Sequence, residues 1–307
     1  MKLEGLHHVT MITADAQATV DFYAGTLGLR LVKKTVNFDS PDAYHLYFGD
    51  ETGAAGSILT WFEFPGAARG RAGIGMVHRL QLGVPSDASL DFWAARLHGA
   101  ERGERSLRFT DPDGLALELV VSDLGNPPLQ AVHPEVPAEH AITGVEGARA
   151  YSAFAPVAEG VLTDVLGFEH EGAGEYRLQG DERGFRWAYD PAPGLAGRQG
   201  AGTVHHIAWA SRDEEHLAWQ ERIAGADGYV TEVRDRDYFR SIYFREPRGV
   251  LFEIATVSPG FAVDEDPHRL GEELRLPRMH EHLRERLERM LTPVENPRSR
   301  RREEQRA

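Results

Sequence analysis

The sequence contains no cysteine and no long apolar run, and its lysines stand only at positions 2, 33 and 34. The lack of cysteine excludes disulfide bonds, thiolate metal ligands and a cysteine nucleophile. No apolar stretch approaches the roughly 20 residues that span a bilayer. The first residues also lack the basic and apolar regions of a secretory signal. We therefore expect a cytoplasmic protein with no membrane-spanning segment.

Negative charge exceeds positive charge, with a formal net charge of −14 over 307 residues. Proteins that bind nucleic acids generally present basic surfaces, so nucleic acid is not an expected partner. Hydrophobic residues make up 41% and charged residues 27% of the chain, which is typical of globular proteins. The length suffices for one large domain or two of ordinary size.

The chain repeats itself. "LHHVTMIT" (6–13) and "VHHIAWAS" (204–211) each begin with a histidine pair. An aspartate follows each segment, Asp15 or Asp213, where a helix N-cap is expected, and an amphipathic stretch comes next. Each stretch runs into glycine, as helix ends commonly do: Gly28 in the first case and Gly225 or Gly228 in the second.

The far ends of two segments also match. "DPDGLALELV" (111–120) and "EPRGVLFEIA" (246–255) share Pro-x-Gly-x-x-x-Glu, which predicts a turn that enters a strand. Together the repeats predict an α+β fold of four strand–helix–strands units, at residues 4–64, 75–122, 146–190 and 203–257.

The proline-rich segment "GNPPLQAVHPEVPAEH" indicates a linker between two halves of the chain. We expect an N-terminal domain at 1–124 with the first two units, a linker at 125–142, and a C-terminal domain at 143–260. Residues 261–307 form a C-terminal extension with helical charge pairing, and its end, "NPRSRRREEQRA", is expected to be disordered. Whether the chain forms a homo-oligomer, and whether the extension contacts a second subunit, stays open.

Strand alternation indicates which histidines face a cavity. His8 shares a face with Thr10, and His206 shares a face with small residues, whereas the opposite faces carry bulky residues that suit a core. On strict alternation His7 and His205 point the other way, unless a β-bulge re-aims them. They could also be hydrogen-bonded core histidines.

Glu253 lies in the apolar strand "VLFEIAT", where a buried carboxylate needs a partner. A metal ion would satisfy it. Aligning the units places Thr60 of the first unit opposite Glu253 of the fourth, so three good ligands remain: His8, His206 and Glu253. Two imidazoles and one carboxylate with open positions are the pattern of non-haem Fe(II) oxygenases. Mn(II) uses the same ligands, so Fe(II) and Mn(II) are both open.

The same alignment predicts no metal between the second and third units. Their inward positions are His78, Glu118, Gly147 and Ala188, which include only two potential ligands. We interpret His78 and Glu118 as a structural hydrogen-bonded pair or as the remains of a former site.

Several segments resemble the vicinal oxygen chelate superfamily, which includes glyoxalase I and the extradiol ring-cleaving dioxygenases. "GLHHVTMIT", "FYAGTLGLRLVKKTVNFDSPDAYHLYFGD", "DRDYFRSIYFREPRGVLFEIAT" and "LGEELRLP" are most similar to the hydroquinone-type ring-cleaving dioxygenases. The resemblance implies four βαβββ modules in two tandem glyoxalase/bleomycin-resistance-like domains. It also implies that the first and fourth modules form the site, with iron ligands at His8, His206 and Glu253.

The resemblance further implies that five polar residues surround the substrate: His7, Thr10, His205, Arg236 and Tyr243. From the residues alone, the Tyr243 phenol could bind a ring hydroxyl or a developing oxyanion, or it could lie at the surface. Arg236 could hold a phenolate or form a surface ion pair with Asp235 or Asp237.

The resulting functional hypothesis is an Fe(II)-dependent dioxygenase that opens hydroquinone or substituted hydroquinone rings with O2. His205 or His7 would handle protons, since imidazole titrates near neutral pH. One alternative is a glyoxalase-like metal-dependent isomerase or thiol transferase, although Thr60 stands where such sites commonly carry a second carboxylate. The other is a non-catalytic resistance protein that sequesters an aromatic compound or a quinone.

Overall fold

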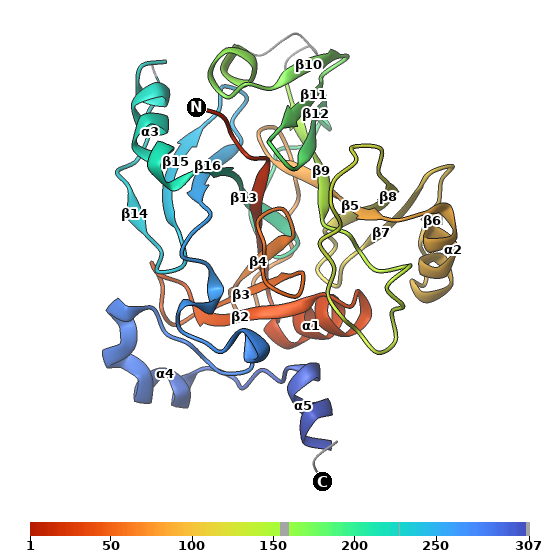
Figure 1. The fold of residues 1–307 in the computed structure, drawn as a ribbon, viewed down its shortest axis with the longest axis vertical. Coiled ribbons are helices and arrows are strands. Elements are labelled where there is room, and N and C mark those ends of the chain that lie inside the picture. The colour runs from red at the N-terminus through yellow and green to blue at the C-terminus, as the bar shows by residue number, and fades with distance from the viewer. Residues whose placement is uncertain (154–159, 227, 305–307) are drawn as a thin grey trace.

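The structure is a computed structural model that describes residues 1–153, 160–226 and 228–304. Two eight-stranded sheets form the framework of the described chain, with short helices at their margins (Figure 1), so the predicted α+β class is confirmed. None of the described helices is both long enough and apolar enough to cross a membrane.

Each predicted unit is a βαβββ module. The first module comprises β1 Leu6–Thr13, α1 Ala16–Val20, the π-helical η1 Asp21–Thr26, β2 Arg30–Val36, β3 Tyr44–Gly49 and β4 Ile58–Glu63. The second comprises β5 Val77–Val84, α2 Asp87–Arg96, β6 Glu101–Arg102, β7 Ser106–Thr110 and β8 Ala116–Val121.

The second half repeats this order. The third module comprises β9 Val145–Ser152, the π-helical η2 Val161–Val165, β10 Glu169–Gly172, β11 Glu175–Gln179 and β12 Gly184–Pro191. The fourth comprises β13 Thr203–Ser211, the 3-10 turn η3 Asp213–Glu215, α3 His216–Ala224, β14 Arg234–Asp235, β15 Arg240–Arg245 and β16 Leu251–Thr256.

The sheets pair the modules across the chain. One sheet has the order β14-β15-β16-β13-β1-β4-β3-β2, and the other has the order β10-β11-β12-β9-β5-β8-β7-β6. The first and fourth modules therefore share a sheet through the antiparallel pair β1/β13, as predicted, and the second and third share the other through β5/β9. Each sheet combines one module from the N-terminal half with one from the C-terminal half. The predicted domain boundaries at 124 and 143 therefore stay a prediction.

Only one of the two predicted helix caps forms. The Asp15 side chain accepts from the backbone N–H of Ala18 and N-caps α1. Asp213 is instead the first residue of η3, and the prediction of a cap there is wrong. Its carboxylate accepts from the Ser258 hydroxyl, so it serves the chain that leaves β16 rather than the helix.

The C-terminal extension lies along the β2 side of the first sheet (blue in Figure 1). Its elements are the 3-10 turns η4 Phe261–Val263, η5 Pro267–Arg269 and η6 Arg278–Leu283, and the helices α4 Arg284–Met290 and α5 Pro297–Glu304. Lys33, which is fully buried, anchors it through ion pairs to Asp264 and Glu265.

The expected disorder of the chain end is wrong up to residue 304, where α5 forms. Arg298 holds this helix through two contacts to the Glu51 carboxylate, at 2.6 and 3.0 Å. A guanidinium that binds a carboxylate through two hydrogen bonds stabilises the helix more than a solvated arginine would. The composition of this segment suggested only solvated charges. Residues 305–307 lie outside the described part of the chain.

The first and second modules meet through a buried carboxyl. The Tyr23 hydroxyl donates to Asp111 across 3.1 Å. Burial raises the pKa of Asp111 to about 6, although the Leu115 N–H donates to the carboxyl and opposes the shift. Because the folded state then binds the proton more tightly than the unfolded chain, this group stabilises the protein most at low pH.

Asp111→Asn should remove this pH dependence. Between pH ~4 and ~6 the wild type should lose about 1–3 kcal/mol of unfolding free energy relative to the variant, because the raised carboxyl ionises there. Urea denaturation at a series of pH values measures the difference. A difference that stays constant over this range would contradict the raised pKa.

Candidate metal centre

The Pro-x-Gly turn sets where Glu253 enters its strand. In the turn between β15 and β16, the Glu246 carboxylate accepts from the backbone N–H groups of Arg248 and Val250, at 2.8 and 2.7 Å. Gly249 takes a φ of 106°, which a side chain would disfavour. The strand that follows then pairs Glu253 with Ala208 of β13.

Two β-bulges place the histidine pairs. In the β1/β13 ladder Leu6 pairs with Trp209 and His8 with Ala208, which leaves His7 as the extra residue on β1. The ladder shifts again between Thr10 and Met11, which leaves His205 as the extra residue on β13. At a bulge, adjacent side chains do not point strictly to opposite faces of the sheet. The two rings of each histidine pair can therefore lie next to each other.

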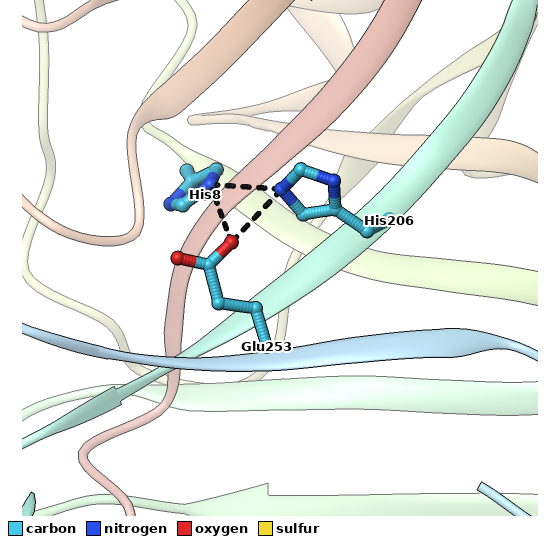
Figure 2. A group of neighbouring side chains, drawn as sticks. All are labelled: His8, His206 and Glu253. Atoms are coloured by element: carbon cyan, nitrogen blue, oxygen red, sulfur yellow. Dashed lines mark hydrogen bonds and ion pairs between the residues drawn. The ribbon is translucent and has the colours of Figure 1, made fainter. Parts of the chain in front are cut away.

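Three ligand atoms from three strands converge (Figure 2). His8 Nε2 and His206 Nε2 lie 3.3 Å apart, and Glu253 Oε2 lies 2.9 Å from the second and 3.4 Å from the first. Glu253 is fully buried, and its Oε2 has no hydrogen bond of acceptable geometry. Its Oε1 accepts from the Ser241 hydroxyl, which fixes the carboxylate plane. An orphaned carboxylate oxygen beside two imidazole nitrogens fits a divalent cation.

Hydrogen bonding fixes the tautomer of His8. His7 Nε2 lies 3.1 Å from the carbonyl oxygen of Thr256, which can only accept, so this nitrogen carries the proton. His7 Nδ1 is then an acceptor, and it lies 2.8 Å from His8 Nδ1. His8 must therefore donate from Nδ1, and Nε2 is the nitrogen that lies near Glu253.

The second pair has the same arrangement. His205 Nδ1 lies 2.8 Å from His206 Nδ1. Burial, followed in size by the charge of the adjacent histidine, lowers the pKa of His7 to about 3 and that of His205 to about 4. Both rings are thus neutral at neutral pH, and the contact of His7 Nε2 with Thr256 makes His7 Nδ1 an acceptor. A hydrogen bond to the far nitrogen is the usual way in which a protein orients a ligating histidine.

The protonation states suit a metal. Burial lowers the pKa of His206, which keeps the ring neutral. Burial raises the pKa of Glu253, but the adjacent His8 and His206 outweigh this effect and hold that pKa well below its usual value. Neutral imidazole and ionised carboxylate are the forms that coordinate a cation.

A pocket opens on one side of this centre. Aromatic residues and several polar groups line it together with His8 and His206; the aromatic ones are Phe38, Tyr47, Phe62, Phe239 and Tyr243. Thr10, Arg236 and Tyr243 line this pocket, whereas His7 and His205 are not among the residues that line it. They lie behind the ligands.

Arg236 bridges the pocket mouth. Its guanidinium lies 3.1 Å from the Asp39 carboxylate of the first module and 5.8 Å from the centre of the Tyr243 ring. The alternative of an ion pair with Asp235 or Asp237 is wrong, because Arg278 of the C-terminal extension pairs with both. The extension therefore braces the loop that carries Arg236.

The second sheet has no comparable centre among the described residues. Its ladders pair Gln81 with Glu118 where the first sheet pairs Thr10 with Thr60, so Arg79, rather than His78, stands at the place of His8. The predicted alignment was off by one because His78 occupies the bulge, as His7 does.

The predicted pair of His78 with Glu118 is also wrong. His78 lies 2.8 Å from Asp190, while Glu118 accepts from Arg108 and Gln81 at 2.8 and 2.9 Å. On this sheet arginine and glutamine side chains thus bind Glu118, whereas on the first sheet Glu253 lies beside two imidazoles.

The sequence interpretation missed His45 and Tyr47 of β3, which also line the pocket. Tyr47 pairs with Thr60 in the β3/β4 ladder, and His45 shares its face. Extending the alternation that identified His8 to "YHLYFG" would have found both.

The family assignment follows from comparison with known proteins. A family model described as the Glyoxalase/Bleomycin resistance protein/Dioxygenase superfamily matches residues 5–119 and 161–254. The chain belongs to this superfamily. Maize glyoxalase I has the same fold, with a TM-score of 0.58 at 13% identity over 83% of this chain and 92% of that one.

Two relatives match almost end to end. "Putative ring-cleaving dioxygenase MhqO" of Bacillus subtilis (strain 168) is 44% identical over 311 residues, covering 96% of this chain and 97% of the relative. The chlorohydroquinone/hydroquinone 1,2-dioxygenase of Sphingobium indicum is 32% identical over 306 residues, covering 90% and 92%.

A solved structure from B. subtilis subsp. subtilis str. 168, described as a "putative dioxygenase", superposes with a TM-score of 0.88 at 41% identity. It covers 96% of this chain and 98% of that one. The predicted tandem glyoxalase-like fold is confirmed.

His7→Ala should weaken metal binding about 10–100-fold, the usual cost of losing the group that orients a ligating histidine. Titration of the metal-free protein with Mn(II) measures the affinity. His78→Ala is the matched control, since it removes the bulged histidine of the other sheet, and it should leave the affinity unchanged. Equal affinities for the His7 variant and the wild type would contradict the orienting role.

Proposed function

We propose that this protein is an Fe(II)-dependent dioxygenase that opens the ring of hydroquinone or a substituted hydroquinone with O2, in the cytoplasm. The observation that carries the proposal is the set His8, His206 and Glu253, whose ligand atoms converge beside an aromatic pocket. Two imidazoles and one carboxylate leave coordination positions free for other ligands. The relative named as a chlorohydroquinone/hydroquinone 1,2-dioxygenase supports the substrate class.

Bound at these ligands, Fe(II) supplies open positions for a ring oxygen and O2 and a route for electrons between them. Mn(II) would occupy the same ligands. The chain's residues supply the rest. Phe62 and Phe239 offer apolar surface on which an aromatic ring can lie, and both line the pocket beside the ligand histidines.

Tyr243 and Arg236 are placed to hold a ring oxygen. Burial raises the pKa of Tyr243, so its hydroxyl stays protonated and can donate. The ring stands edge-on to His206, with centroids 5.7 Å apart, which places the phenol beside the metal ligands. The Arg236 guanidinium over the same ring adds positive charge where a phenolate would need it.

His7 and His205 have a supporting role in this proposal. His7 accepts a hydrogen bond from His8, and His205 Nδ1 lies 2.8 Å from His206 Nδ1; neither His7 nor His205 lines the pocket. Proton handling by His7 or His205 stays a prediction from the sequence. Contact of these two residues with substrate stays a prediction from the family resemblance.

A glyoxalase-like isomerase is the alternative within the superfamily. Thr60 stands where a second carboxylate would complete such a site, and its hydroxyl bonds to His45 and Thr10. This arrangement favours the dioxygenase. A protein that only sequesters aromatic compounds would need the pocket but would have no use for an unsatisfied Glu253.

The proposal predicts oxygen consumption. Anaerobically Fe(II)-loaded protein mixed with hydroquinone and 18O2 should yield a ring-opened product that carries two labelled oxygen atoms. Glu253→Gln should lower the rate at least 100-fold, because the neutral amide is a poorer ligand than the carboxylate. Glu118→Gln, in the matching Pro-x-Gly-x-x-x-Glu motif of the other sheet, is the control and should stay near wild type.

Oxygen electrode traces separate the alternatives. An isomerase consumes no O2, and a sequestering protein would bind the hydroquinone without converting it. No oxygen uptake across a panel of hydroquinones and catechols, with iron content confirmed, would overturn the dioxygenase proposal.

A further inference from the structure

A chain of hydrogen bonds runs from β3 through β4 to the pocket face of β1. Tyr47 Oη lies 2.9 Å from His45 Nδ1, and His45 Nε2 lies 2.8 Å from Thr60 Oγ1. The Thr60 hydroxyl donates to Thr10 Oγ1 across 3.0 Å. Thr60 is fully buried and does not line the pocket, whereas Thr10 does.

The protons in this chain can be counted. A hydroxyl carries one proton, and Thr60 gives its proton to Thr10, so His45 Nε2 must be the donor to Thr60. Burial lowers the pKa of His45 well below its usual value, so the ring is neutral and Nδ1 is an acceptor. Tyr47 then donates to Nδ1, and every bond runs toward the pocket.

The last proton belongs to Thr10. Its oxygen already accepts from Thr60, and no acceptor for its own proton occurs among residues 1–153, 160–226 and 228–304. Thr10 lies two positions from His8 on the cavity-facing side of β1. Its free O–H is therefore directed to whatever binds beside the metal ligands.

We propose that Tyr47, His45 and Thr60 are positioning residues that make Thr10 an obligate hydrogen-bond donor, so that the pocket selects a deprotonated ring oxygen, a phenolate, over the neutral phenol. Charge-assisted hydrogen bonds are roughly twice as strong as neutral ones, and a donor that cannot rotate to accept discriminates against a protonated oxygen. The inference rests on the proposed function for the choice of a phenolic ligand. It deepens that function by naming the ionisation state in which the phenolic ligand binds.

Binding of 4-nitrophenol to the Fe(II)-loaded protein under anaerobic conditions tests the inference without turnover. Absorbance reports whether the bound ligand is ionised. The wild type should lower the pH at which the bound ligand ionises. Thr60→Val, which is isosteric but lacks the hydroxyl, should weaken 4-nitrophenolate binding about five- to tenfold, the usual weight of one hydrogen bond.

Three controls isolate the hydroxyl chain. Thr60→Ser keeps the hydroxyl and should bind 4-nitrophenolate like the wild type. 4-Nitrotoluene has the same shape but cannot ionise, so its affinity should not change in the Thr60 variants. Tyr47→Phe removes the donor that fixes the His45 tautomer and should act in the same direction as Thr60→Val.

The inference is overturned if Thr60→Val or Tyr47→Phe binds 4-nitrophenolate like the wild type, or if Thr60→Ser loses as much affinity as Thr60→Val. An equal loss for 4-nitrotoluene would also overturn it, since packing would then be the cause. Oxygen uptake with hydroquinone is measured separately. Selective phenolate binding without oxygen uptake would contradict the proposed function alone, and uptake without selectivity would contradict this inference alone.

Discussion

The fully buried Glu253 carboxylate is the constraint on which the rest of the structure depends. One oxygen accepts from Ser241, and the other faces two imidazole nitrogens without a hydrogen bond. An uncompensated buried charge costs several kcal/mol, so a partner is required. The surrounding chain holds this carboxylate in place through the turn capped by Glu246 and the ladder that pairs Glu253 with Ala208.

The doubled histidines follow from the same constraint. A ligand ring must present a lone pair, and a neutral acceptor behind it enforces that state. The bulges at His7 and His205 make this possible, because an unbulged strand would send adjacent side chains to opposite faces. The second sheet keeps both bulges, at His78 and Glu146, but places Arg79 and Gly147 after them. The same backbone thus supports a candidate metal centre or an ion-pair network, according to which side chains follow the bulge.

The sequence was sufficient to predict the modules and the convergence of His8, His206 and Glu253, because both follow from periodicity. Repeated motifs located the units, and one apolar strand with a lone glutamate identified Glu253. It was insufficient for the residues that depend on register or on contacts between distant segments. The place of Arg79 depends on a bulge, and the partner of Arg236 is Asp39, which lies on another module. Helix α5 depends on the Arg298–Glu51 pair, which composition cannot indicate.

The central claim is that His8, His206 and Glu253 together hold one divalent metal ion. Anomalous diffraction at the iron absorption edge, from crystals of the protein loaded anaerobically with Fe(II), tests it directly. The account predicts one strong peak per chain, within coordination distance of His8 Nε2, His206 Nε2 and a Glu253 carboxylate oxygen. A peak on the sheet of the second and third modules, or no peak near Glu253 in crystals shown to contain iron, would contradict it.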